Sequence, residues 1–309
     1  MKIVFLDRKT IGEDVSYEKF YDLGEVVIYD YSTPEQIPER IKDADIIVLN
    51  KMPINEKTVG QAKNLKLVCV TATGTNNLDK EYLKKAKIEW RNVAGYSTEA
   101  VTQHTFALLF YLLEHLNYYD KYVKEEKYVN DEMFTHFEKH FHELSGKTWG
   151  IIGLGNIGKR VAEVASCFGA KVIYYSTSGK NHDNKYEETD FEGLLKNSDI
   201  ISIHAPLDEN TQGLIDKEAL KKMKKSAILI NVGRGPIVVE ADLADALEEG
   251  EIAAAGLDVL SEEPMREKNP LRRIKDSDKL FITPHIAWAG KETRQRLMDI
   301  IAMQISEFI

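Results

Sequence analysis

The sequence predicts an α/β protein built from two doubly wound parallel sheets. Short apolar runs, rich in β-branched residues, alternate with polar stretches that are compatible with helices, and this βαβ rhythm occurs in two successive series. A chain of 309 residues also exceeds the usual size of a single hydrophobic core. A glycine-rich turn opens the second series, halfway along the chain. We therefore expect two domains, each with its own sheet.

The first series occupies about the first hundred residues. Its expected strands are Ile3 to Leu6, Val26 to Tyr29, Ile46 to Leu49, Leu67 to Val70 and Ile88 to Arg91. Polar, helix-compatible stretches separate these strands, which favours parallel pairing.

A long helix is expected between the two series, from Glu99 to Tyr118. It contains the longest apolar run, Phe106 to Leu113, which is too short to cross a bilayer. The charged and aromatic stretch that follows, Asp120 to Glu143, shows no clear period, so we predict only that it lies at the boundary between the series.

The second series begins with a strand at Thr148. Its further strands are expected at Lys171 to Tyr175, Asp199 to His204, Ala227 to Asn231, Ala253 to Val259 and Lys279 to Thr283. The last segment, Trp288 to Ile309, has apolar residues at helical spacing. Since a lone helix needs a surface on which to pack, we expect it to return to the first domain. The domains are then 1–98 with 288–309, and 99–287 with the linking helix 99–118.

The composition excludes several classes of function. The net charge is -9 and the pI is about 5.5, which argues against a general nucleic-acid binder. Neither a signal peptide nor a membrane span is visible, so we expect a cytoplasmic protein. The two cysteines, Cys69 and Cys167, have no metal-like or redox spacing, and we expect both to be buried and no metal to be bound.

The turn after Thr148 to Ile152 carries Gly153, Gly155 and Gly158 and leads into a helical run from Ile157 to Phe168. In a strand-turn-helix context, this spacing is typical of a dinucleotide site. The first glycine permits the tight turn, the second lets a pyrophosphate approach the backbone, and the third lets the helix pack on the strand.

Three side chains suited to chemistry follow successive strands of the second series: Arg234, Glu263 and His285. The carboxyl ends of such strands face the ligand crevice. Hydride transfer to a carbonyl also needs a proton, and histidine is the side chain with a suitable resting pKa. A carboxylate on the other ring nitrogen would orient the imidazole and favour its charged form. Arginine offers paired donors for a 2-oxo acid.

Each of these side chains also has an ordinary structural interpretation. His285 could close a strand end, Glu263 could lie in a solvated loop, and Arg234 could form a surface ion pair. Their shared position at strand ends favours the functional interpretation. Glu262 adjoins Glu263, and only the following proline favours Glu263 as the residue that faces the histidine.

Over nearly its whole length, the chain resembles the D-isomer-specific 2-hydroxyacid dehydrogenases, especially the glycerate dehydrogenase (hydroxypyruvate reductase) branch. The matching segments are Ala72 to Asp79, Asn92 to Thr98, Gln103 to Leu109, Gly153 to Gly158, Gly233 to Gly235, Glu263 to Pro264 and Pro284 to Ala289. The resemblance implies a flavodoxin-like substrate domain and a Rossmann dinucleotide-binding domain.

The resemblance also implies roles for individual residues. His285 is expected as the acid/base, Glu263 as its partner and Arg234 as the clamp on the substrate. The backbone N–H groups around Thr73, Gly74 and Thr75 are expected to cradle the substrate carboxylate. Asp258 is expected at the nicotinamide amide. The other expected cofactor contacts are Thr98, Gly153, Gly155, Asn156, Ile157, Gly158, Ala205, Pro206 and Val232.

Further expectations from the resemblance leave alternatives open. Met52 and Trp288 are expected to line the far side of the substrate, although both could be packing residues. His104 lies in the apolar helix and favours a structural role. The run Phe106 to Leu113 suits a homodimer interface, although burial within one subunit would also explain it.

One departure from the family pattern concerns the cofactor. Where NAD-selective members carry an acid for the ribose, this chain has Ser176, Thr177, Ser178, Gly179 and Lys180. The hydroxyls and Lys180 suit a 2′-phosphate, but the arginine typical of an NADP enzyme is absent. We expect NADP(H) rather than NAD(H). The predicted function is reduction of a small 2-oxo acid such as hydroxypyruvate or glyoxylate. The alternatives are a bulkier 2-oxo acid, or a dinucleotide-sensing co-repressor.

Overall fold

A computed structural model describes all residues, 1–309, and divides the chain into two compact units. The first unit comprises Met1–Ser97 with Trp288–Ile309, and the second comprises Thr98–Ala287. Thr98 therefore lies in the second unit, one residue from the expected boundary. Each unit contains one parallel sheet, which confirms the predicted fold class. No helix is long and apolar enough to span a bilayer.

The sheet of the first unit has five strands in the order β2-β1-β3-β4-β5. The strands are β1 (Lys2–Phe5), β2 (Glu25–Ile28), β3 (Ile46–Leu49), β4 (Leu67–Val70) and β5 (Glu89–Arg91). All neighbours pair in parallel. This order is the flavodoxin-like one, in which the strand sequence reverses direction between β1 and β3.

Helices cover both faces of this sheet. They are α1 (Glu18–Tyr21), α2 (Ile37–Arg40), α3 (Glu56–Val59), α4 (Lys80–Ala86) and α11 (Lys291–Phe308). Because side chains alternate along a strand, Ile3 and Phe5 pack with α1 and α11, whereas Val4 and Leu6 pack with α2, α3 and α4. Leu297, Ile301 and Ile305 of α11 are completely buried. The C-terminal helix therefore completes the core of the first unit.

The sheet of the second unit has seven strands in the order β12-β11-β10-β9-β6-β7-β8. They are β6 (Thr148–Ile152), β7 (Lys171–Tyr175), β8 (Glu187–Glu188), β9 (Ile200–Ile203), β10 (Ile228–Asn231), β11 (Ala254–Leu257) and β12 (Leu280–Ile282). The order is that of a Rossmann sheet with one added strand, and its direction reverses between β6 and β9. Strand β8 has no apolar run, which explains why the sequence did not predict it.

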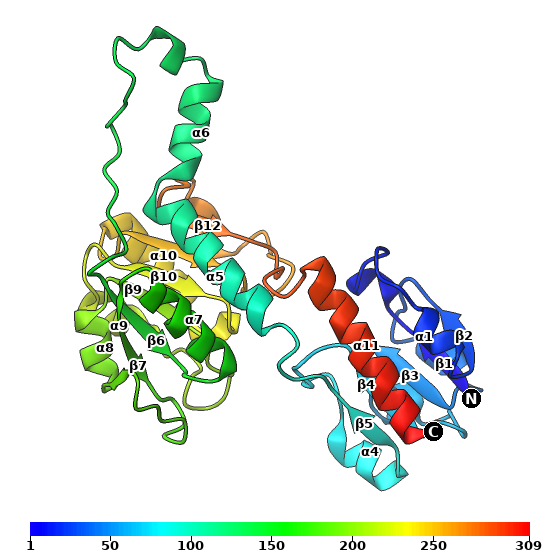
Figure 1. Ribbon diagram of the computed structural model, residues 1–309. Coiled ribbons are helices and arrows are strands. Elements are labelled where there is room, and N and C mark those ends of the chain that lie inside the picture. Colours follow the sequence, from blue (N-terminus) through cyan, green and yellow to red (C-terminus); the bar gives the residue numbers. More distant parts are fainter. The chain divides into compact units, whose positions relative to one another are not determined.

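Two sets of helices flank the second sheet (Figure 1). Helix α5 (Thr98–Leu113) packs against α7 (Asn156–Cys167). The other set is α8 (Phe191–Asn197), α9 (Lys217–Lys222) and α10 (Glu240–Glu249), whose apolar residues share one core with alternate residues of the strands. Short 3-10 turns lie at η1 (Arg8–Thr10), η2 (Tyr128–Asn130), η3 (Gly235–Ile237) and η4 (Pro270–Arg273).

The prediction of a single linking helix from Glu99 to Tyr118 is wrong. Helix α5 ends at Leu113, and a new helix, α6 (Leu116–Lys124), follows. His115 between them has a φ of 52°, a left-handed conformation that interrupts a right-handed helix. We call residues 114–143 the arm, because α6 and the segment after it extend away from the second sheet (Figure 1).

The expected burial of both cysteines is half right. Cys69 lies in β4 and is completely buried, and burial raises the pKa of its thiol to about 12. Cys167 is exposed at the C-terminal end of α7. The helical spacing of Cys167 did not reveal this, because α7 ends at that residue and its last turn is open to solvent.

Candidate active site

The glycine turn after β6 contains two glycines that the protein itself requires. Gly153 has a φ of +90°, and a Cβ there would lie 2.8 Å from the backbone nitrogen of Ala205, which follows β9. A Cβ on Gly158 would lie 2.3 Å from the carbonyl oxygen of Gly153. These close approaches join β6, β9 and α7 at the point where the strand order reverses.

Gly155 is different. Its φ is -80°, which any residue can adopt, and a Cβ there would meet nothing within 4 Å. The protein's own packing therefore does not require glycine at this N-cap of α7. Open space beside the first turn of a helix of twelve residues fits a bound pyrophosphate, and Asn156 and Ile157 begin that helix.

The segment after β7 supplies a second sign of a ligand. The hydroxyl of Ser176 is buried and has no hydrogen-bond partner within the protein. Buried hydroxyls are normally paired, so this one is available to a ligand. Lys180 is exposed, and its backbone N–H donates to the hydroxyl of Ser178 at 3.2 Å. Thr177 is half-buried between them.

The end of β9 carries a polar group that the sequence analysis did not single out. His204 bonds through Nε2 to the Ser202 hydroxyl at 2.9 Å, while its Nδ1 is buried without a partner. Burial lowers the pKa of His204 to about 3, so its ring is neutral near pH 7. Ala205, which follows, is buried, and Pro206 is exposed.

His285 and Glu263 form a direct pair. Nδ1 of His285 lies 2.7 Å from Oε2 of Glu263, and Oε1 of Glu263 accepts the backbone N–H of Leu260 at 2.9 Å. Glu262 instead pairs with Arg266 at 2.6 Å. The structure therefore decides which of the two adjacent glutamates faces the histidine.

The backbone of His285 is held in an uncommon conformation. Its φ is 56°, which is rare outside glycine, and such residues concentrate at functional sites. The backbone N–H of His285 donates to the carbonyl oxygen of Asp258 at 2.8 Å. The side chains of His285 and Glu263 are 29% and 35% exposed, so a ligand can reach the pair.

Asp258 holds the loop that carries His285. Its buried carboxylate accepts the backbone N–H groups of Ile286 and Ala287 at 2.8 and 2.9 Å. It also accepts the hydroxyl of Thr283 at 2.6 Å, and His104 of α5 bonds to that hydroxyl at 2.8 Å. Nε2 of His104 also lies 3.4 Å from Oδ1 of Asp258. Burial opposes the charge of Asp258, but the contact with His104 and the hydrogen bonds from Thr283, Ala287 and Ile286 hold its pKa below the ordinary value. His104 thus has a structural contact, linking α5 to this loop.

Arg234 lies in a tight turn after β10. A Cβ on the next residue, Gly235, would lie 1.9 Å from the carbonyl carbon of Leu260, so this turn presses against the turn that contains Glu263. Nη1 of Arg234 donates to the carbonyl oxygen of Gly233 at 2.8 Å, and Asn231 braces the turn through both of its amide atoms. Val232, beside it, is buried.

In the first unit, the segment after β4 presents backbone donors. The N–H groups of Thr73, Gly74 and Thr75 donate to no other group of the protein, and the residues are exposed or half-buried. The hydroxyl of Thr73 donates to Val93 O at 2.9 Å, and Asn92 donates to Thr73 O at 2.6 Å. The segment is therefore fixed while its N–H groups stay available to an anion.

Met52 and Trp288 both contact the core of the first unit. Met52 is 6% exposed and packs among the apolar residues beneath α2, α3 and α4. Trp288 is half-buried, and its ring lies 6.5 Å from that of Tyr96 in an edge-on arrangement. These contacts support packing roles for both residues. Thr98, another predicted contact, is the first residue of α5.

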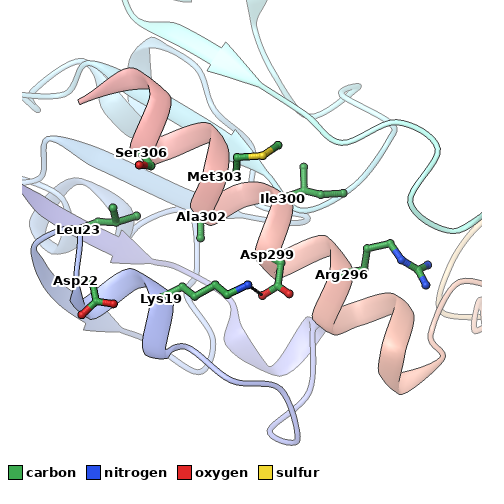
Figure 2. Close-up of a pocket in the computed structure, with 9 residues that line it drawn as sticks. All are labelled: Lys19, Asp22, Leu23, Arg296, Asp299, Ile300, Ala302, Met303 and Ser306. Atoms are coloured by element: carbon green, nitrogen blue, oxygen red, sulfur yellow. Dashed lines mark ion pairs between the residues drawn. The ribbon is translucent and has the colours of Figure 1, made fainter.

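A hollow of the first unit lies elsewhere, between α1 and α11 (Figure 2). Its volume is about 490 Å³, and an ion pair between Lys19 and Asp299, 3.1 Å long, crosses it. None of the predicted site residues lines it. The hollow therefore takes no part in the candidate site.

Comparison with known proteins identifies the family. The model of the NAD-binding domain of the D-isomer-specific 2-hydroxyacid dehydrogenases matches residues 106–287. The chain belongs to this family. The prediction of a nicotinamide-dependent oxidoreductase in the 2-hydroxyacid dehydrogenase family is therefore confirmed.

Relatives and solved structures cover nearly the whole chain. It is 39% identical to a hydroxypyruvate reductase of Blautia hydrogenotrophica, covering 100% of this chain and 97% of that protein. It is 37% identical to a glycerate dehydrogenase of Methylorubrum extorquens, covering 100% and 96%. A D-lactate dehydrogenase of Aquifex aeolicus, solved with NAD and lactic acid, is 27% identical with a TM-score of 0.83, covering 99% and 95%. An acyclic imino acid reductase solved with NADPH and D-Arg is 28% identical with a TM-score of 0.86, covering 100% and 97%.

Besides His204, two polar residues of the first unit that hold segments of the candidate site were not predicted from the sequence, Asp7 and Asn77. Asp7 accepts the backbone N–H of Asn50, which follows β3. Asn77, in the segment after β4, donates its side-chain amide to Met52 O, also after β3. Asp7 directly follows an apolar strand, and that position is the one feature of the sequence that could have drawn attention to it.

Proposed function

We propose that this dehydrogenase reduces a small 2-oxo acid, of the hydroxypyruvate or glyoxylate type, to the D-2-hydroxy acid. The pairing of His285 with Glu263 is the observation that carries the proposal, because it supplies an oriented proton donor on a ring that a ligand can reach. The relatives named hydroxypyruvate reductase and glycerate dehydrogenase support the substrate class.

In the proposed reaction, His285 gives a proton to the carbonyl oxygen of the substrate. A nicotinamide dinucleotide supplies the hydride that reaches C2 when it is bound. Since Nδ1 of His285 faces Glu263, Nε2 is the atom that donates the proton. Glu263 is fixed by the backbone N–H of Leu260, so the carboxylate keeps the ring in one orientation and stabilises its positive charge.

We propose that two groups hold the substrate carboxylate. The guanidinium of Arg234 donates to Gly233 O within its own turn and has further N–H donors for an anion. The N–H groups of Thr73, Gly74 and Thr75 form the second group. A backbone cradle of this kind binds an anion without any basic side chain.

For the cofactor we propose NADP(H) in preference to NAD(H). The segment 176–180 contains no carboxylate, and it offers the unpartnered hydroxyl of Ser176 and the exposed Lys180. Asp183, the next acid along the chain, is paired with Lys159 of α7 at 3.2 Å. A 2′-phosphate therefore meets no unpaired negative charge in this segment.

One experiment tests both parts of the proposal. The wild-type protein is mixed with NADPH or NADH and a panel of 2-oxo acids, and the loss of absorbance of the reduced cofactor is followed. We expect hydroxypyruvate or glyoxylate to give the highest kcat/KM, and NADPH to exceed NADH. Binding of the cofactor with no reduction of any 2-oxo acid would overturn the proposed activity. A preference for NADH would overturn only the cofactor proposal.

We further propose that two copies pair through the arm. Large exposed apolar residues concentrate there: Leu116, Val123, Tyr128, Val129, Met133, Phe134, Phe137 and Phe141. The arm nevertheless has internal order, because Tyr122 donates to Asp131 at 2.7 Å and its ring stacks on His136 at 3.8 Å. An ordered apolar surface of this kind is typical of a protein interface.

Analytical ultracentrifugation tests this assembly. We expect the wild-type protein to sediment as a dimer and a Phe134→Ser/Phe137→Ser variant to dissociate at micromolar concentration. A Tyr21→Ser variant, which alters an exposed aromatic residue of the first unit, serves as the control and is expected to stay dimeric. A wild-type monomer would contradict the proposal.

A further inference from the structure

Asp7 is a buried acid that the proposed reaction does not use. It lies just beyond β1, after Leu6, and the residue is 3% exposed. Its Oδ1 accepts the N–H of Asn50 at 2.9 Å, and its Oδ2 accepts the N–H of Lys51 at 2.9 Å. Burial raises the pKa of this carboxyl, although the bonds from these N–H groups work in the opposite direction. A carboxylate whose burial is unfavourable thus accepts hydrogen bonds from two neighbouring backbone N–H groups.

These bonds lie beyond the carboxyl ends of the strands, where ligands bind in sheets of this type. Asp7 lies just after β1 and Asn50 just after β3, and the strand order reverses between these two strands. In doubly wound sheets, the crevice beyond the carboxyl ends of the strands at such a point receives the ligand. The position of Asp7 therefore points to a ligand independently of its burial.

Asn77 extends the connection to the cradle of N–H groups. Its side-chain amide donates to Met52 O at 2.8 Å and to Asn50 O at 3.3 Å. The backbone N–H of Ile54 donates in turn to Asn77 O at 2.8 Å. The turn after β3 is therefore bonded on one side to Asp7 and on the other to the segment after β4, which contains Thr73 to Thr75.

We propose that Asp7 is a positioning residue for the 2-oxo acid. It holds the turn Asn50–Met52 and, through Asn77, keeps the N–H groups of Thr73 to Thr75 in the geometry that receives the substrate carboxylate. This inference rests on the proposed function. Asp7 touches neither substrate nor cofactor, so its loss weakens substrate binding and leaves the chemical step intact.

The test compares Asp7→Asn with Asp45→Asn. Asp45 is the control because it also accepts a backbone N–H, that of Lys2 at 2.9 Å, and joins the start of β1 to the start of β3, at the opposite ends of the same strands. Its other oxygen pairs with Lys66 at 3.1 Å. In both variants one carboxylate oxygen is replaced by an amide nitrogen, which donates but cannot accept a hydrogen bond. Both lose an acceptor for a backbone N–H, but only one does so beside the cradle.

Steady-state kinetics and hydrogen exchange give the readouts. For Asp7→Asn we expect the KM of the 2-oxo acid to rise about tenfold, the effect of losing one charge-assisted hydrogen bond. The kcat and the dissociation constant of NADPH stay unchanged, and the amides of Asn50 and Lys51 lose protection from exchange. For Asp45→Asn we expect an unchanged KM.

Three results overturn the proposal: an unchanged KM in Asp7→Asn, an equal rise in Asp45→Asn, or a fall in kcat instead of a rise in KM. If Asp7→Asn does not fold, Asn77→Ala replaces it, since it cuts the same connection at its other end and must raise KM alone. Failure of the proposed function is distinguishable, because the wild-type protein then reduces no 2-oxo acid. An active wild type with an unaffected variant contradicts only the role of Asp7.

Discussion

Each unit presents its functional groups beyond the carboxyl ends of the strands of its own sheet, but the groups are of different kinds. The second unit offers side chains, with His285 and Glu263 in direct contact and Arg234 in a neighbouring turn. The first unit offers backbone N–H groups, at Thr73 to Thr75. Proton transfer needs a particular side chain, whereas binding of an anion needs only donors in the right place.

The buried carboxylates that hold these two groups of donors, Asp258 in the second unit and Asp7 in the first, also differ. Asp258 accepts a hydroxyl from Thr283 besides two backbone N–H groups, with His104 close by, and its pKa is lowered. Asp7 accepts only backbone N–H groups, and burial raises its pKa. Both buried carboxylates hold a loop through backbone N–H groups, yet their pKa values shift in opposite directions, because the donors around them differ.

The largest expected effect is the loss of activity when His285 of the second unit is replaced. We expect His285→Ala to lower kcat by about two to four orders of magnitude, because the proton donor is lost. Dissociation of NADPH, measured by fluorescence titration, is expected to change little. A matched control is His182→Ala, since His182 pairs with Glu188 at 2.8 Å in the same unit but outside the proposed triad. Its kcat at saturating cofactor is expected to equal that of the wild type.

A different outcome would break the comparison between the units. If His285→Ala raised KM and kept kcat, the second unit would bind the substrate rather than react with it. If both histidine variants lost kcat equally, the effect would belong to the fold and not to the pair of His285 and Glu263.

The elements of the fold were predictable where the pattern of the sequence is local. Strands β3, β4 and β7 have the bounds that their apolar runs predict. The linking helix failed at His115, because the apolar run continues toward that point and nothing in its spacing marks a left-handed residue. Asp278 lies 3.5 Å from Nδ1 of His115, and a partner so distant in the chain is invisible to local reasoning.

The candidate site was predictable to the extent that its groups are side chains in motifs. Arg234, Glu263 and His285 follow strands that the sequence marks clearly. The choice between Glu262 and Glu263 needed the structure, because the deciding donor is the backbone N–H of Leu260. Asp7 was missed, since its partners are backbone groups 43 and 44 residues away.

The next expected effect is smaller and concerns the glycine turn. We expect Gly155→Ala to raise the dissociation constant of NADPH about tenfold, because its Cβ would enter the space proposed for the pyrophosphate. Its thermal stability is expected to change little. In Gly158→Ala the Cβ meets a backbone oxygen instead, so the melting temperature is expected to fall. Titration and thermal unfolding of both variants check this. A Gly155→Ala protein that binds NADPH normally would remove the pyrophosphate from this turn.

The smallest expected effect is the pH dependence of stability, which tests the two carboxylates against each other. The lowered pKa of Asp258 means that its contribution is present above the unfolded value, about pH 4, and is lost as the pH falls through its folded pKa. The raised pKa of Asp7 means that its contribution is present below about pH 4 and is lost as the pH rises through its folded pKa.

Urea unfolding midpoints of the wild type, Asp7→Asn and Asp258→Asn between pH 3 and pH 7 make this measurable. Because asparagine does not titrate, the advantage of the wild type over Asp258→Asn should shrink as the pH falls below about 4. Its stability relative to Asp7→Asn should instead rise as the pH is lowered from 7 toward about 4. If the stability differences between the wild type and the two variants changed with pH in the same direction, the hydrogen bonds from Thr283 and His104 would not give the two carboxyl groups opposite pKa shifts.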